Sequence, residues 1–137
     1  MKRVATLILA TLALSGAVFV TGAAGHKVKF DTTVTAKFNK ADKKDPYAKP
    51  ANFDGSVNSA KRRCIKNRTV TLRLRAANGT TSVVGTDLTD ASGAWLIAPT
   101  SVAPGTYFAK VTKRVLRKNT KHRHTCRRAV SKDVKVK

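Results

Sequence analysis

The chain contains two cysteines, and each lies within a run of basic residues. Cys64 belongs to the run 61–68 (KRRCIKNR), and Cys126 belongs to the run 121–128 (KHRHTCRR). A disulfide between them closes a loop of about 60 residues, which the chain-entropy model values at about 4 kcal/mol of stability. It also holds two strongly positive segments together against their mutual repulsion. This pair therefore restricts the possible folds more than any other feature of the sequence.

The first 24 residues have the layout of a secretory signal peptide. Lys2 and Arg3 precede an apolar stretch over residues 4–20, and small residues follow at 21–25. This order is typical of signal peptides, and the apolar stretch is short for a membrane span. We expect cleavage near Ala23 or Ala24, no remaining transmembrane segment, and a bacterial protein that is secreted or otherwise extracytoplasmic. An uncleaved membrane anchor is the alternative. Because oxidising compartments favour disulfides, we expect the two cysteines to be bonded.

Hydrophobic periodicity favours strands over helices in the rest of the chain. Apolar and polar residues alternate over 28–38, and the sequence contains no Glu or Gln and few strong helix formers. Charged residues and Pro-containing dipeptides mark 39–52 as a loop. The complete set of predicted strands is 28–38, 53–59, 69–75, 82–88, 94–98, 106–115 and 129–137. Seven short strands predict one all-β domain over 25–137, folded as an antiparallel β-sandwich.

Short motifs between these strands resemble those of a known family. They are Gly55-Ser56-Val57, Val70-Thr71-Leu72, Thr89-Asp90 with Gly93 and Trp95, and Pro104-Gly105 with Tyr107. This pattern, over 53–115, resembles the transthyretin-like, carboxypeptidase-regulatory-like domains, which are bacterial Ig-like β-sandwiches. The resemblance implies an Ig-like topology and a non-catalytic accessory role, and it supplies no site residues. In such a topology the loops that hold Cys64 and Cys126 lie at the same end of the sandwich.

Charge provides the main indication of function. The formal net charge is +21, or about +19 without Lys2 and Arg3, and residues 76–109 contain no Lys or Arg. A concentrated positive surface attracts anions, so we expect binding to an anionic cell-envelope polymer or an acidic polysaccharide. The alternative is a structural or protein-interaction module whose charge only keeps it soluble. The candidate anion-binding residues are Lys61, Arg62, Arg63, Lys66, Arg68, Lys121, Arg123, Arg127 and Arg128.

Other functions have less support in the sequence. Nucleic-acid binding is disfavoured because the basic runs contain no aromatic residue for base stacking. His122, His124 and Cys126 would share one face of an extended segment and offer ligands for zinc or copper, but an oxidised Cys126 and the surrounding cations argue against a metal. No motif for a catalytic nucleophile, a phosphate loop or a metalloprotease occurs. We therefore expect neither enzymatic activity nor a cofactor.

Overall fold

The computed structural model describes residues 25–42, 44, 45, 47, 49–119 and 121–137. The expected signal peptide, residues 1–24, lies outside this part of the chain. The described residues contain no α-helix, so the predicted all-β class is confirmed. The elements, in order, are β1 (His26–Phe30), β2 (Thr33–Val34), β3 (Lys37–Asn39), β4 (Asn52–Asn58), the 3₁₀ helix η1 (Arg62–Cys64), β5 (Thr69–Arg75), β6 (Thr81–Leu88), β7 (Ala94–Ile97), β8 (Gly105–Val111), β9 (Arg114–Lys118), β10 (His122–Cys126), β11 (Ala129–Val130) and β12 (Val134–Val136).

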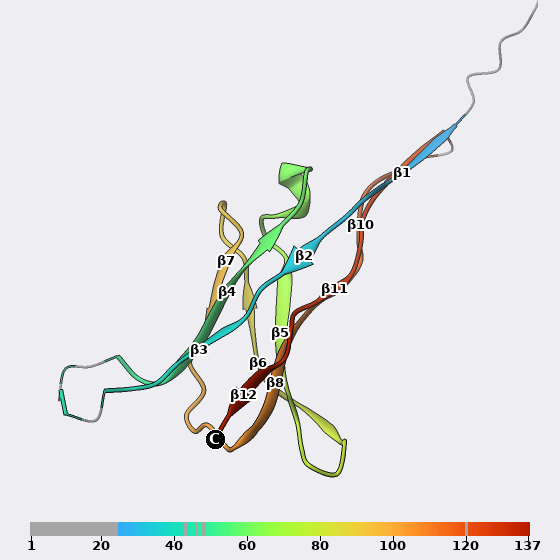
Figure 1. Cartoon of the computed structure of the whole chain (residues 1–137). Helices are drawn as coiled ribbons and strands as arrows, with labels where there is room; N and C mark the ends of the chain where they lie inside the picture. The colour runs from blue at the N-terminus through green and yellow to red at the C-terminus, as the bar shows by residue number, and fades with distance from the viewer. Residues whose placement is uncertain (1–24, 43, 46, 48, 120) are drawn as a thin grey trace, which may run out of the picture.

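Two antiparallel sheets form the body of the molecule (Figure 1). In the larger sheet the strand order is β11-β8-β5-β6, and β12 also pairs with β8. In the smaller sheet β4 pairs with β2, β3 and β7. Buried residues of both sheets form a shared core, an arrangement consistent with a β-sandwich.

The core is built from alternate residues of the paired strands. Successive side chains of a strand face opposite sides of a sheet, so every second residue of β4, β5, β7 and β8 points inward. The expected burial of Trp95 and Tyr107 is confirmed, since they are 3% and 1% exposed. The buried members of the cluster are Val34, Phe53, Val57, Val70, Leu72, Trp95, Ile97, Tyr107, Ala109 and Val111.

The described residues form more strands than the seven predicted, because three predicted strands are divided and one was missed. The segment 28–38 becomes β1, β2 and β3, because the chain changes partner from β10 to β4 after Phe30. The segment 106–115 becomes β8 and the start of β9, and 129–137 becomes β11 and β12. The unpredicted strand is β10, within the second basic run.

A third sheet, hereafter called the arm, consists of β1, β10 and β9 in that order. Figure 1 shows β1 and β10 running side by side away from the body. β9 is antiparallel to β10, but β1 is parallel to it, so the prediction of purely antiparallel pairing was wrong here. Parallel neighbours need a long crossover connection. In this chain the strands β2 to β9 lie in the sequence between β1 and β10.

The predicted turn between β6 and β7 depends on Asp90 and Gly93. The Asp90 Oδ1 atom accepts hydrogen bonds from the Ser92 hydroxyl at 2.7 Å, the Ala94 N–H at 3.0 Å and the Ser92 N–H at 2.8 Å. These bonds hold the pKa of Asp90 below its ordinary value, and the bond from the Ser92 hydroxyl contributes most to this lowering. Gly93 has a φ of 90°, and a Cβ there would lie 2.2 Å from the Val57 carbonyl oxygen. No other residue fits this position without a shift of the backbone.

Candidate anion-binding site

The predicted disulfide between Cys64 and Cys126 is confirmed. Cys64 ends η1, Cys126 ends β10, and both side chains are fully buried. Their Cα atoms are 5.4 Å apart although 62 positions separate them in sequence. The bond therefore joins the two basic runs, as the sequence predicted.

Arg68 lies beneath this junction and does not belong to the binding surface. Its side chain is 2% exposed, so its prediction as an anion-binding residue was wrong. Its Nη1 atom donates to the Cys64 carbonyl oxygen at 2.7 Å, and its Nη2 atom donates to those of Thr112 at 2.7 Å and Arg127 at 3.2 Å. Burial lowers the pKa of Arg68, and repulsion from Arg114 lowers it further. The guanidinium therefore donates its hydrogen bonds to carbonyl groups within the fold rather than to an external anion.

The residues around η1 form the first of two basic clefts. We call it the η1 cleft; its volume is about 520 Å³, and apart from Ala60 all of its lining residues are basic. Each of these side chains is exposed, because the short 3₁₀ helix buries only Cys64. Lys61 also lies over the Phe30 ring, with its Nζ atom 5.8 Å from the ring centroid. The basic residues of the η1 cleft are Lys61, Arg62, Arg63 and Lys66, all of them predicted candidates.

A second cleft of about 520 Å³ lies at the base of the arm. Its lining combines the predicted Arg127 and Arg128 with Lys29, Lys113 and the nearly buried Thr125. The Arg127 Nη1 atom forms an exposed ion pair with the Asp31 Oδ1 atom at 3.0 Å, which reduces its availability to other anions. Only one other ion pair, Arg75–Asp133, occurs among the described residues. Most of the positive charge at this end of the protein therefore has no carboxylate beside it.

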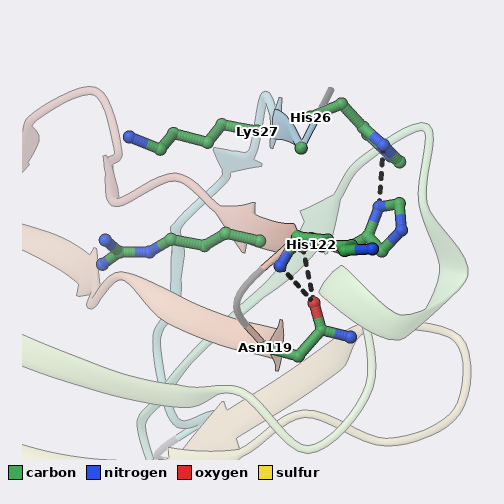
Figure 2. Close-up of a pocket in the computed structure, with 7 residues that line it drawn as sticks. His26, Lys27, Asn119 and His122 are labelled. Atoms are coloured by element: carbon green, nitrogen blue, oxygen red, sulfur yellow. Dashed lines mark hydrogen bonds between the residues drawn. The ribbon is translucent and has the colours of Figure 1, made fainter. Parts of the chain in front are cut away.

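The basic surface continues from the second cleft along one face of the arm. Lys27 pairs with Arg123 and Lys29 with Thr125, so these four side chains share a face of the parallel ribbon. Figure 2 shows Lys27 extending away from His26 and His122, which occupy the opposite face. Residues two positions apart on a strand are about 6.6 Å apart along it, so the charges form a row. We call this row the basic strip; it comprises Lys27, Lys29, Lys113, Arg123, Arg127 and Arg128.

The structure thus divides the nine predicted anion-binding residues among several places. Arg123, Arg127 and Arg128 belong to the basic strip, four residues belong to the η1 cleft, and Arg68 is buried. Lys121 lies beyond the strip, in a small cleft of about 230 Å³ at the tip of the arm. Sequence reasoning missed Lys27, Lys29 and Lys113. Alternation did predict that Lys29 points outward from a strand, but only the parallel pairing with β10 places it beside the second basic run.

The metal alternative loses one of its ligands. The Cys126 sulfur is bonded to Cys64 and does not act as a thiolate. In the part of the chain that the structure describes, no three His, Cys, Asp or Glu side chains are arranged to hold a metal ion. His122 and His124 instead contact a third histidine, His26.

Comparison with known proteins supplies no family for this chain. No family model, no curated protein and no solved structure matches it. Across the described residues, no helix is both long enough and apolar enough to cross a membrane.

Proposed function

We propose that the protein binds an anionic cell-envelope polymer or acidic polysaccharide through the basic strip and the η1 cleft. The single observation that carries this proposal is the row of basic residues that leads from the disulfide to the arm. A line of charges suits a linear polymer with repeating anionic groups better than a compact ligand. The role is one of attachment, with no catalytic step.

Electrostatics supports a binding role for this surface. The disulfide and the β1–β10 pairing bring cations together at a cost in mutual repulsion, and a polyanion relieves that repulsion when it binds. Charge that served solubility alone would not need to be concentrated in this way. Binding of this kind weakens as salt rises, because the screening length is about 8 Å at physiological ionic strength.

We further propose a secreted, extracytoplasmic location and an Ig-like, transthyretin-like fold. The disulfide supports the location, since such bonds persist in oxidising compartments. The Tyr107 hydroxyl supports the fold, because it donates to the Ala103 carbonyl oxygen at 2.6 Å. A tyrosine that bonds back to the main chain a few residues upstream is a recurring feature of Ig-like sandwiches.

An interaction module is the second candidate function. Leu88 and Leu96 are 60% and 56% exposed, and both line a shallow cleft beside β6 and β7. Exposed leucines beside a strand with an unpaired edge are suited to contact with another protein. In that case the basic surface serves only solubility.

Three variants that each lose four positive charges separate these functions. The strip variant replaces Lys27, Lys29, Arg123 and Arg128 with Gln, and the η1 variant replaces Lys61, Arg62, Arg63 and Lys66. The control variant replaces Lys37, Lys110, Lys135 and Lys137, which are exposed elsewhere. The measurement is the salt concentration that elutes each protein from an immobilised sulfated polysaccharide.

The proposal predicts early elution of the strip and η1 variants and near wild-type elution of the control variant. Equal losses in all three variants would show that net charge alone is responsible, and the binding function would then be rejected. Circular dichroism and thermal unfolding establish that each variant is folded.

A further inference from the structure

All three histidines of the chain gather on one face of the arm. They are His26 on β1 and His122 and His124 on β10. The parallel register places His26 opposite His122 and Val28 opposite His124. The ring centroid of His26 lies 4.4 Å from that of His122 and 5.4 Å from that of His124. Figure 2 shows the contact between His26 and His122 at the tip of the arm.

His26 uses both of its ring nitrogens in this cluster. Its Nδ1 atom is 2.8 Å from the Nδ1 atom of His122, and its Nε2 atom is 3.2 Å from the Nε2 atom of His124. Each of these contacts is a hydrogen bond only if one nitrogen carries a proton and the other has a free lone pair. Three neutral rings satisfy both contacts. So does a single protonated His26, which donates to both neighbours.

Further protonation is incompatible with these contacts. When the cluster carries two protons more than three neutral rings do, only one ring nitrogen keeps a lone pair, so one contact must break. With three, every ring nitrogen is a donor and neither hydrogen bond remains. The N–H groups released in this way need new acceptors, and an oxyanion accepts several of them at once.

The surroundings favour an anion over a metal cation. The small cleft at the tip is lined by Gly25, His26, Lys27, Asn119, Lys121, His122 and Arg123, and its charged members are all basic. The Phe30 ring packs edge-on against His124, and Lys61 lies over that ring. The acid that follows Phe30, Asp31, is paired with Arg127.

Asn119 adds a neutral donor at the same place. Its Oδ1 atom accepts the backbone N–H groups of Lys121 and His122 (Figure 2). This orients the side-chain amide, because only the oxygen accepts such bonds, and its Nδ2 atom is left to donate elsewhere.

We propose that the histidine cluster is a proton-controlled site for a phosphate or sulfate group of the bound polymer. In the structure the rings bond to one another, and protons taken up beyond the first release ring N–H groups that bind the oxyanion. Histidine is the side chain that ordinarily changes charge between pH 5 and 8, and every histidine of this chain belongs to the cluster. Because the anion favours the protonated rings, affinity rises as pH falls and binding takes up protons. The choice of polymer rests on the proposed function, whereas the site is testable alone.

The decisive experiment compares the wild type with the triple variant H26Q/H122Q/H124Q at pH 5.5 and 7.5 and constant ionic strength. The probe is a sulfated oligosaccharide, whose sulfate esters keep the same charge at both pH values. We expect the wild type to bind at least fivefold more tightly at pH 5.5, and the triple variant to bind equally at both. A poly(glycerol phosphate) probe, also of constant charge, shows whether phosphodiesters or sulfate esters bind better.

The same fold-change with pH in wild type and triple variant would overturn the proposal. Failure of the wild type to bind either polymer at any pH would reject the proposed function alone. In that case the anion site at the histidine cluster is tested by NMR titration with inorganic sulfate at pH 5.5. The proton resonances of the three histidines should shift, and unchanged resonances would reject the site. Stoichiometric Zn²⁺ binding at pH 7.5 that is lost in the triple variant would assign the cluster to a metal and also overturn the proposal.

Discussion

The guanidinium of Arg68 donates a hydrogen bond to the carbonyl oxygen of Arg127, with an Nη2–O distance of 3.2 Å. Two residues of like charge, 59 positions apart, are thus connected through the backbone of one of them. The same guanidinium bonds to the carbonyl oxygens of Cys64 and Thr112. A buried cation therefore links three chain segments beneath the disulfide, and carbonyl dipoles compensate for its lost hydration.

Replacement of Arg68 with Ala should destabilise the protein by about 3 kcal/mol, because it removes charge-assisted hydrogen bonds and leaves three carbonyl groups, among them the buried one of Cys64, without this donor. Urea unfolding measures the loss. The matched control is Arg62→Ala, which removes an exposed arginine from the same run and should change stability by less than about 0.5 kcal/mol. Similar small losses in both variants would contradict a structural role for Arg68.

Replacement of both cysteines with Ser should lower the free energy of unfolding by about 4 kcal/mol in the chain-entropy model. It should also make stability rise more steeply with NaCl than in the wild type. Without the bond the basic runs separate in the unfolded chain, so folding must bring them together against repulsion that salt screens. Denaturant unfolding at 0.05 and 0.5 M NaCl tests both effects. If stability rose equally with NaCl in the wild type and in the variant, the two runs would not repel each other in the folded state.

Asp90 should contribute to stability above the pKa of an unfolded aspartate, and this contribution should disappear as pH falls through its lowered folded pKa. Asp90→Asn keeps an acceptor oxygen but removes the titrating carboxyl group. The stability of this variant should therefore decline less steeply below pH 4 than that of the wild type. Thermal unfolding between pH 2 and 7 compares the two proteins. An acid decline as steep in Asp90→Asn as in the wild type would contradict this role of the Asp90 carboxylate.

Tyr107→Phe should cost about 1 kcal/mol, because it removes the hydrogen bond to the Ala103 carbonyl while leaving the aromatic packing against Phe53 in place. The control is Tyr47→Phe, which alters a side chain that is 94% exposed. Thermal unfolding of both variants is sufficient. A neutral result for Tyr107→Phe would remove one support for the Ig-like relationship.

The body of the fold was predictable because its strands follow local rules. β5 matches its predicted range, and β4, β6 and β7 differ from theirs by one residue at each affected end. The pairing of residues 69–75 with 81–88 depends on regular alternation and a short turn, both of which can be read from the sequence. The disulfide followed from the expected compartment.

The arm was not predictable, because its central pairing is parallel and joins residues close to opposite ends of the described chain. Alternation in 28–38 identified a strand but not its partner, so Lys27 and Lys29 could not be grouped with Arg123. The histidine cluster was hidden for the same reason, since His26 is far from His122 and His124 in sequence. Arg68 was misassigned because a basic run gives no indication of which member finds carbonyl acceptors inside the fold.

The position of the disulfide also bears on how the chain assembles. Docking β1 against β10 brings together residues 96 positions apart, and the register places Phe30 opposite Cys126. Once Cys126 is bonded to Cys64, the loop from Phe30 to that junction contains only about 35 residues. The shorter loop lowers the entropic cost of its closure, as a free energy, by somewhat less than 1 kcal/mol. Oxidation therefore shortens the loop that this long-range pairing must close. Chains oxidised before they fold should complete the arm faster than chains that reach the same structure with free thiols.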